Sequence, residues 1–288
     1  MRILVTGSNG QLGKTLHRLF DKENRENVVY TDVDTLDLTD KEALEFFFQK
    51  ESFDIIINCA AYTAVDKAET NSVACSKVNV EAVNNIAEIA RRLKIRVIHI
   101  STDYVFNGEN HRPYEENDTP DPRSTYGHTK LTGEGILKSF CPSSIIIRTA
   151  WLYSEYGNNF LNTMLKLASE RKEIRVVSDQ IGTPTYAKDL AQLIIKIIDA
   201  EEWKPGVYHF TNEGVASWYD FAKAIFRISG NKNIKVIPIL SKDYPTVAKR
   251  PHYSVLNKSK IKKTYGIEIA YWEDALAKCI TKLEKIKI

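Results

Sequence analysis

The first half of the chain alternates short runs of Ile and Val with longer segments whose apolar residues recur every three or four positions. Near-continuous apolar runs fit strands that are buried on both faces, as in a parallel sheet. The predicted strands are 2–6, 28–32, 54–61, 96–102 and 144–151. Since strands alternate with helices, we expect right-handed βαβ crossovers and an α/β fold with a doubly wound parallel sheet.

Two predicted helices in this half have clear sequence signals. One is expected to begin at Thr39, where residues 39–42 fit a capping box before the apolar segment ALEFFF. The other is predicted to run without interruption over about 72–93.

The second half is less regular. The predicted strands here are 174–179, 206–212 and 234–240, and the two clearest helices cover 187–200 and 271–286.

Charge and cysteine content exclude several classes of protein. The 40 Lys and Arg residues are interspersed with 37 Asp and Glu, and the net charge is only +3. A nucleic-acid or membrane surface needs concentrated positive charge, so we expect neither kind of partner. The four cysteines form no C-x-x-C pair, which favours a reducing compartment over a disulfide framework or a zinc site. No signal peptide or 18-residue apolar span is found, and a cytoplasmic location is expected.

A glycine-rich turn, GSNGQLG (7–13), follows the first strand and opens a helix. Glycines at Gly7, Gly10 and Gly13 permit a tight turn and a close approach of the backbone. The N-terminus of the helix can then meet a pyrophosphate with its free N–H groups and its positive dipole end. Glycines also punctuate many turns that bind nothing, so this spacing needs support from its context.

Asp32 supplies part of that context. It ends the second predicted strand, nineteen residues after Gly13, where an acidic residue commonly accepts hydrogen bonds from the ribose of a dinucleotide. A carboxylate at this position repels a 2′-phosphate, which favours NADH over NADPH; Lys14 offsets this only in part. Asp32 can equally be a turn residue at a strand end, as Asp34 and Asp37 nearby suggest.

The spacing Y-x-x-x-K occurs twice, at Tyr126/Lys130 and at Tyr219/Lys223, so spacing alone does not identify a site. The second pair lies in an amphipathic helical segment and is interpreted as structural. The first pair follows the strand 96–102, which ends in Ser101 and Thr102 at the carboxyl edge of the sheet, where open α/β folds bind ligands.

A hydroxyl, a phenol and an ammonium at that edge can together protonate a carbonyl oxygen. We predict that Lys130 lowers the pKa of Tyr126 from about 10, so that Tyr126 acts as a general acid. Lys130 can also hold a nicotinamide ribose. Thr102 is expected to bind the carbonyl oxygen as charge develops on it.

Several motifs in order along the chain resemble one known family. GSNGQLG (7–13), STDYVF (101–106) and STYGHTK (124–130) resemble the extended short-chain dehydrogenase/reductases, which have a Rossmann-type fold. Its dTDP-4-dehydrorhamnose reductase branch is matched further by AAYTAVDKAE (60–69), RTAWLY (148–153), GNNF (157–160), DQIGTPT (179–185) and KRPHYSVLN (249–257). The resemblance covers nearly the whole chain.

The resemblance implies a division of labour along the chain. Residues 1–150 would form an NAD(P)-binding Rossmann domain, and residues 151–288 mainly a smaller α/β domain for a sugar nucleotide, with the chain returning to the first domain for part of its C-terminal half. The implied reaction is reduction of dTDP-4-dehydro-β-L-rhamnose with NADPH or NADH.

The resemblance also implies roles for individual residues. The catalytic set would be Thr102, Tyr126 and Lys130. Cofactor contacts would come from Gly7, Gly10, Gln11, Leu12, Gly13, Asp32, Asp37, Leu38, Ala61, Tyr62, Thr63, Tyr126 and Lys130. Substrate contacts would come from Thr102, Asp103, Tyr104, Trp151, Asn159 and Arg250. Trp151 can instead fill core, Arg250 can be a surface charge, and Asn159 can cap a helix.

Other functions within and beyond this superfamily stay open. Sugar-nucleotide dehydratases carry Thr-Asp-Glu where this chain has Thr102-Asp103-Tyr104, which removes the base needed for water elimination. A related reductase or an epimerase of a 6-deoxyhexose pathway, or a non-catalytic NAD(P)-binding regulatory subunit like that of methionine adenosyltransferase, would keep the same fold.

A metal site is not expected. Some reductases of this branch bridge subunits through Mg²⁺ held by an acidic residue after the glycine turn, but this chain has Lys14-Thr15 there and Lys188 in the second ligand region. A monomer or a homodimer without a metal bridge is therefore expected.

Overall fold

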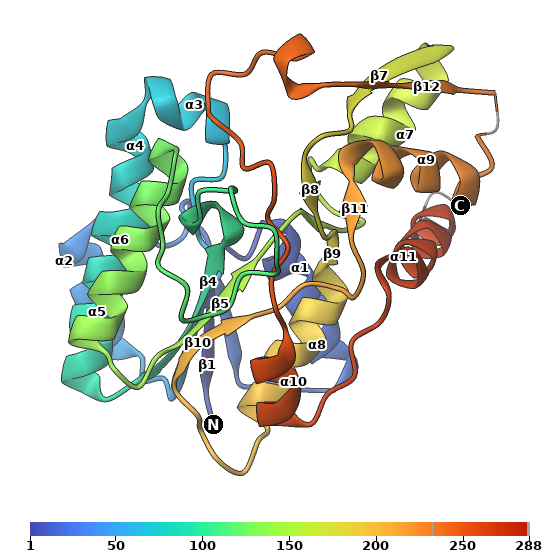
Figure 1. Cartoon of the computed structure of the whole chain (residues 1–288). Helices are drawn as coiled ribbons and strands as arrows, with labels where there is room; N and C mark the ends of the chain where they lie inside the picture. Colours follow the sequence, from blue (N-terminus) through green and yellow to red (C-terminus); the bar gives the residue numbers. More distant parts are fainter. Residues whose placement is uncertain (232, 287–288) are drawn as a thin grey trace.

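The computed structural model describes residues 1–231 and 233–286. Its centre is a six-stranded sheet in the order β10-β5-β4-β3-β1-β2, with every neighbouring pair parallel (Figure 1). The strands are β1 (Ile3–Thr6), β2 (Val28–Thr31), β3 (Ile55–Asn58), β4 (Arg96–Thr102), β5 (Ile145–Thr149) and β10 (Gly206–His209). The predicted doubly wound parallel sheet is confirmed.

Helices cover both faces of this sheet (Figure 1). One side carries α1 (Gln11–Lys22), α8 (Ala187–Ile198) and α10 (Ser259–Tyr265). The other carries α2 (Lys41–Lys50), α5 (Ala82–Leu93) and α6 (Thr125–Phe140). Alternate residues of β3 show how the Ile runs satisfy both layers, because Ile55 and Ile57 pack towards α1 and α8 while Ile56 packs towards α5.

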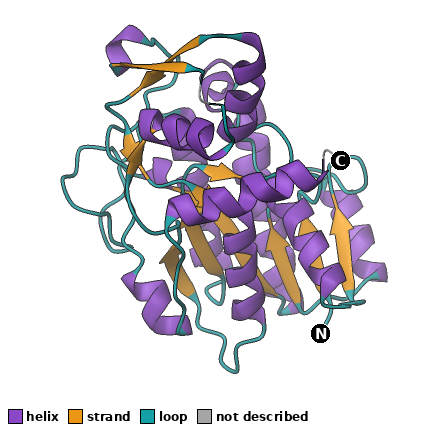
Figure 2. Cartoon of the chain, turned by 90° about the vertical axis from the view of Figure 1, so that its right-hand side faces the viewer, coloured by secondary structure: helices purple, strands orange, loops and turns teal. Residues whose placement is uncertain are grey.

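The second half builds a smaller layer above the carboxyl ends of these strands (Figures 1 and 2). Its strands are β6 (Leu152–Tyr153), β7 (Glu173–Val177), β8 (Ile181–Gly182), β9 (Thr185–Tyr186), β11 (Ala216–Ser217) and β12 (Lys235–Ile239), which pair as β6-β9, β7-β12 and β8-β11. Its helices are α7 (Phe160–Glu170), α9 (Trp218–Ile228) and α11 (Trp272–Ile286). A separate apolar core joins them. The division at residue 150 stays a prediction, although β10 and α8 lie with the main sheet.

Two helix predictions differ from the structure. Helix α2 is capped by Asp40, whose side chain accepts a hydrogen bond from the Ala43 N–H at 3.0 Å, and not by Thr39. Asp37 accepts both the Thr39 N–H and its hydroxyl, which holds Thr39 in the preceding turn. The predicted helix over 72–93 is interrupted: α4 (Ser72–Ser76) leads into a π-helical turn (Lys77–Glu81) before α5, and α3 (Val65–Thr70) precedes it. A π-helical turn adds one residue to a helix, and this change is too short to alter the spacing of apolar residues in the sequence.

Among the described residues, no helix is both long and apolar enough to cross a membrane.

Candidate active site

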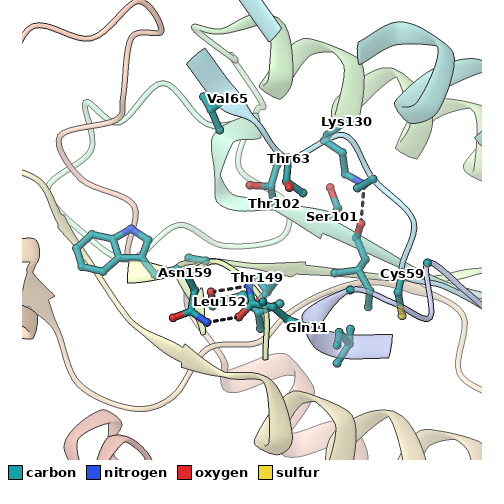
Figure 3. Close-up of a pocket in the computed structure, with 18 of the residues that line it drawn as sticks. Gln11, Cys59, Thr63, Val65, Ser101, Thr102, Lys130, Thr149, Leu152 and Asn159 are labelled. Carbon is teal, nitrogen blue, oxygen red and sulfur yellow. Dashed lines mark hydrogen bonds between the residues drawn. The ribbon is translucent and has the colours of Figure 1, made fainter. Parts of the chain in front are cut away.

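A cleft of about 530 Å³ opens above the carboxyl ends of β1, β3, β4 and β5, between the main sheet and the second layer (Figure 3). It lies near the point where the strand order reverses between β1 and β3, where open α/β sheets bind ligands. The predicted residues that line it are Gly7, Gly10, Gln11, Leu12, Gly13, Ala61, Thr63, Thr102, Asp103, Tyr104, Tyr126, Lys130, Trp151 and Asn159.

The glycine turn is shaped for a close backbone approach. Gly7 has a φ of +64°, and a Cβ there would lie 2.6 Å from the Ala60 nitrogen. A Cβ on Gly13 would lie 2.5 Å from the Gly7 oxygen. Helix α1 begins just after Gly10 without a side-chain cap, so its first N–H groups face the cleft unpaired by side chains, as a pyrophosphate requires.

A second cavity of about 390 Å³ adjoins the glycine turn and contains the remaining predicted cofactor residues, Asp32, Asp37, Leu38 and Tyr62. The Asp32 carboxylate accepts hydrogen bonds from the N–H groups of Asn9 and Val33, each at 2.8 Å. Asp32 therefore holds the glycine turn against β2 as well as facing the cavity. Both cavities share Gly7, Gly10 and Ala61, and together they fit an extended dinucleotide.

Asn79, which the sequence interpretation missed, holds the wall formed by residues 61–63. Its side chain, buried in the π-helical turn, accepts from the Tyr62 N–H at 2.9 Å and donates to the Tyr62 carbonyl at 3.2 Å. It also donates to the Thr129 hydroxyl on α6 at 3.1 Å. The interruption of the helix thus places one amide where it bridges the cofactor wall and the helix that carries Tyr126.

Thr102 and Asp103 lie at the end of β4. The Thr102 hydroxyl donates to the Asp103 carboxylate at 3.0 Å and accepts the Tyr104 N–H at 3.2 Å. Burial raises the pKa of Asp103 to about 6, although hydrogen bonds from Ser254 and Thr102 oppose the shift. One Asp103 carboxylate oxygen is buried without a hydrogen-bond partner in the protein, so it can accept a hydrogen bond from a ligand.

Tyr126 and Lys130 lie one turn apart on α6, both buried against the cleft. Gly127 allows this helix to approach the Tyr104 carbonyl, because a Cβ there would collide with it. The predicted lowering of the Tyr126 pKa by Lys130 is wrong. Burial raises the pKa of Tyr126, and the Thr102 hydroxyl acts in the opposite direction.

Burial is the main cause of this shift in the Tyr126 pKa, and Lys130 makes its own polar contacts elsewhere. The dashed line from Lys130 in Figure 3 marks the hydrogen bond that its Nζ donates to the Ile100 carbonyl at 2.7 Å. The same Nζ lies 3.2 Å from His99 Nε2. Burial lowers the pKa of Lys130 itself to about 8, despite the nearby Glu134 carboxylate. His99 and Glu134 were both missed from the sequence, since a His or Glu within a strand or helix carries no signal of its neighbours.

Trp151 lies at the rim of the cleft in a left-handed backbone conformation, with φ +48°. Its ring stacks on that of Trp218, which opens α9 and also lines the cleft. Trp218 also packs against the apolar core of the second layer. The place of Trp218 in the cleft depends on its stack with Trp151. The spacing of apolar residues within α9 gives no information about that contact.

Asn159 and Arg250 occupy different surroundings. Asn159 caps α7 by accepting the Asn162 N–H at 3.0 Å, and its amide donates to Gln11 Oε1 at 2.9 Å (Figure 3). It therefore ties the second layer to the glycine turn. Arg250 lies outside the main cleft in a neighbouring cavity of about 520 Å³ and pairs with both carboxylate oxygens of Asp66, at 3.1 and 2.6 Å.

The second Tyr/Lys pair does not line the cleft. Lys223 is exposed and Tyr219 half-buried on α9, whose core side is formed by Phe221, Ala222 and Ile225. The structural interpretation of this pair agrees with its position. In the described part of the chain, no group of three or more His, Cys, Asp or Glu side chains could hold a metal ion.

Comparison with known proteins gives a consistent family. Residues 1–285 match the family model described as RmlD substrate binding domain. A dTDP-4-dehydrorhamnose reductase from Aggregatibacter actinomycetemcomitans is 44% identical over 284 residues, covering 96% of this chain and 97% of that protein.

Solved structures agree with this result. The crystal structure of a dTDP-4-dehydrorhamnose reductase from Clostridium acetobutylicum superposes with a TM-score of 0.94 at 43% identity, covering 99% of this chain and all of the other. The structure of the Bacillus anthracis dTDP-4-dehydrorhamnose reductase in complex with NADP gives a TM-score of 0.93 at 37% identity, covering 98% and 99%.

Proposed function

Since this chain belongs to the RmlD substrate-binding-domain family, we propose that it reduces dTDP-4-dehydro-β-L-rhamnose to dTDP-L-rhamnose with NADPH or NADH. The observation that carries this proposal is a single cleft lined by the glycine turn together with Thr102, Tyr126 and Lys130. The family relationship supplies the substrate class, and the cleft supplies the means of reducing a carbonyl group.

The chain's own residues have separable roles in this reaction. Bound NAD(P)H supplies the hydride for C4 of the sugar. Tyr126 donates its phenolic proton to the carbonyl oxygen, which becomes the new hydroxyl group. Thr102 orients that oxygen and stabilises the charge that develops on it. Lys130 binds the nicotinamide ribose through an N–H that faces the cleft, and in its ammonium form stabilises the Tyr126 phenolate left after proton transfer.

The substrate side of the cleft is built from Asp103, Tyr104 and Trp151. Asp103 offers a carboxylate oxygen that has no hydrogen-bond partner in the protein, which suits a sugar hydroxyl. Tyr104 lies beside Tyr126, with ring centroids 5.5 Å apart. A tyrosine here in place of a glutamate lacks the base for water elimination, so simple carbonyl reduction is favoured over dehydration. Arg250 beyond Tyr104 is proposed for the diphosphate, which would require its Asp66 pair to rearrange.

Both nicotinamide cofactors are compatible with the adenosine end of the site. Asp32 disfavours a 2′-phosphate by charge, but its carboxylate already accepts two backbone N–H groups. The related Bacillus anthracis enzyme was solved with NADP. We therefore expect activity with both cofactors. The negative charge of Asp32 should make NADPH the less effective of the two.

The domain organisation and setting follow from the same proposal. Residues 1–150 would hold the cofactor and most of 151–288 the sugar nucleotide, acting as a monomer or as a homodimer without a metal bridge. All four cysteines are free thiols, which is consistent with the reducing cytoplasm.

Purified protein mixed with NADPH or NADH and dTDP-4-dehydro-β-L-rhamnose tests the proposal. We expect the absorbance of the reduced nicotinamide to fall in proportion to the sugar converted, with dTDP-L-rhamnose as the product. An epimerase would convert the sugar with no net change in cofactor, and a regulatory subunit would bind cofactor without turnover. Either result would contradict the proposal.

A further inference from the structure

A buried chain of hydrogen bonds leads from the cofactor wall to Lys130. The Asn58 side chain at the end of β3 accepts the Thr6 hydroxyl at 2.8 Å and the Ala60 N–H at 3.1 Å. Its amide nitrogen lies 3.1 Å from His99 Nδ1, and His99 Nε2 lies 3.2 Å from Lys130 Nζ. Asn58, His99 and Lys130 are each at most 2% exposed, so water does not compete for these contacts.

The donor and the acceptor of each hydrogen bond in this chain can be assigned from the Ala60 N–H onwards. A backbone N–H can only donate, so the Asn58 atom that faces Ala60 must be the oxygen. The amide nitrogen then faces His99 and can only donate, which makes His99 Nδ1 the acceptor. Burial lowers the pKa of His99 well below its ordinary value, and the neutral ring carries one proton. That proton must be on Nε2, the nitrogen that faces Lys130.

This arrangement distinguishes the two forms of Lys130. An ammonium group has three donors and no acceptor, so it cannot form a hydrogen bond with the Nε2–H group of His99, which is also a donor. A neutral amine accepts from Nε2–H with its lone pair. It still donates one N–H to the Ile100 carbonyl at 2.7 Å and keeps another for the cleft.

We propose that His99 is a positioning residue whose N–H, set by Asn58 and Ala60, favours the neutral amine of Lys130 over its ammonium form. Lys130 is then a group that gains and loses a proton close to physiological pH. The lowered pKa of Lys130, about 8, is consistent with this, and desolvation is its largest cause.

The other groups around Lys130 leave His99 as the deciding polar contact. On α6, Tyr126 is neutral because burial raises its pKa. The Glu134 carboxylate acts to raise the pKa of Lys130 and is paired with Arg148 of β5, with 2.7 Å between Nη2 and Oε2. Cys59 follows β3 as a neutral thiol, since burial raises its pKa to about 12. Cys75 on α4 is buried and contacts the Thr129 hydroxyl, and a thiol donates or accepts only weakly.

Nuclear magnetic resonance of the cofactor-free protein tests the inference without reference to any reaction. The ¹⁵N shifts of the His99 ring, assigned by their loss in His99→Gln, should show a protonated Nε2 and an unprotonated Nδ1. The Lys130 side-chain signals, assigned with Lys130→Met, should titrate near pH 8.

Two variants change the direction of the contact. In His99→Gln the side-chain oxygen can face Lys130, and in Asn58→Asp the carboxylate moves the His99 proton to Nδ1. Both present an acceptor to Lys130, so its acid constant should fall at least ~10-fold. His209→Gln, at an equally buried histidine on β10, should leave the Lys130 titration in place. A protonated Nδ1 in the wild-type protein, or an unchanged Lys130 titration in both variants, would overturn the proposal.

The effect on turnover rests on the proposed function and is measured separately. If the Lys130 ammonium stabilises the phenolate, kcat/KM should fall above about pH 8 in the wild-type protein, and this fall should move to higher pH in His99→Gln. If the protein has no reductase activity, the pH dependence of kcat/KM cannot be measured. The resonance titrations then still decide the role of His99.

Discussion

Trp151 and Trp218 stack face to face, with ring centroids 3.6 Å apart and planes within 9° of each other. One ring follows β5 and the other opens α9, so the stack joins the main sheet to the second layer across the cleft. Gly182 on β8 makes room for it, because a Cβ there would lie 2.7 Å from the Trp151 ring. Both rings line the cleft, where the pair forms an apolar wall.

Replacing Trp218 with alanine should weaken substrate binding and leave cofactor binding intact. Without the stack, ordering the Trp151 ring costs binding free energy. A loss of about 0.5–1.5 kcal/mol, the value of one aromatic pair, would raise KM for the sugar nucleotide roughly threefold to tenfold. Steady-state kinetics and a cofactor titration measure the two effects. Trp203→Phe, at a tryptophan bonded to the Ser143 carbonyl away from the cleft, is the control and should change neither. Equal losses of both affinities would argue against a substrate wall.

The duplicated Tyr/Lys spacing provides a matched test of the proton donor. Tyr126→Phe should lower kcat by about 10²–10⁴-fold, as expected for loss of a general acid, while the cofactor Kd changes little. Tyr219→Phe removes the same hydroxyl from the same spacing on the surface of α9 and should keep wild-type kcat. Retained turnover in Tyr126→Phe would remove Tyr126 from the mechanism.

Asp103 should make stability depend on pH in a definite direction. Its pKa is raised from 3.8 to about 6, so the folded protein binds this proton more tightly than the unfolded chain does. Stability is therefore lost as pH rises from about 4 to 6. In Asp103→Asn this loss is absent, and its free energy of unfolding relative to wild type should increase by about 2–3 kcal/mol between pH 4 and pH 7.

Asp118 provides the control of opposite sign. Its pKa is lowered by the Arg112 guanidinium, so it stabilises the fold above its unfolded pKa, and that contribution disappears in acid. Asp118→Asn should therefore lose stability relative to wild type as pH rises from about 3 to 4, and change little from pH 4 to pH 7. Urea denaturation at pH 3, 4 and 7 measures both variants, and a fall in the relative stability of Asp103→Asn between pH 4 and pH 7 would refute the Asp103 prediction.

The buried Glu134–Arg148 pair should matter far more than surface pairs. Glu134 accepts two hydrogen bonds from Arg148 and one from Ser101, and both charged side chains are at most 1% exposed. Glu134→Gln leaves the Arg148 charge buried without a partner and should cost about 3–5 kcal/mol of unfolding free energy. Glu88→Gln, which breaks the exposed pair with Lys41, should cost less than about 1 kcal/mol. Similar costs in the two variants would contradict this reasoning.

The sequence by itself determined the main architecture, because the relevant signals are local. The Ile and Val runs specify strands buried on both faces, and alternation with helices specifies a parallel sheet whose carboxyl ends share one edge. That rule was enough to predict that the glycine turn, Thr102 and Tyr126 lie together, and the structure places all three in one cleft. The same local reasoning interpreted the Tyr219/Lys223 pair as structural, and Tyr219 lies half-buried against the core of the second layer.

The tertiary structure decided everything that depends on partners distant in sequence. The pKa shift of Tyr126 had the wrong predicted sign, because burial and the contacts of Lys130 with Ile100 and His99 are set by packing and not by the i, i+4 spacing. The contribution of Trp218 to the cleft depends in the same way on Trp151, and the pairing of Arg250 depends on Asp66, 184 residues away. Hydrogen bonds and desolvation act over a few ångströms, so only the folded chain determines which groups experience them.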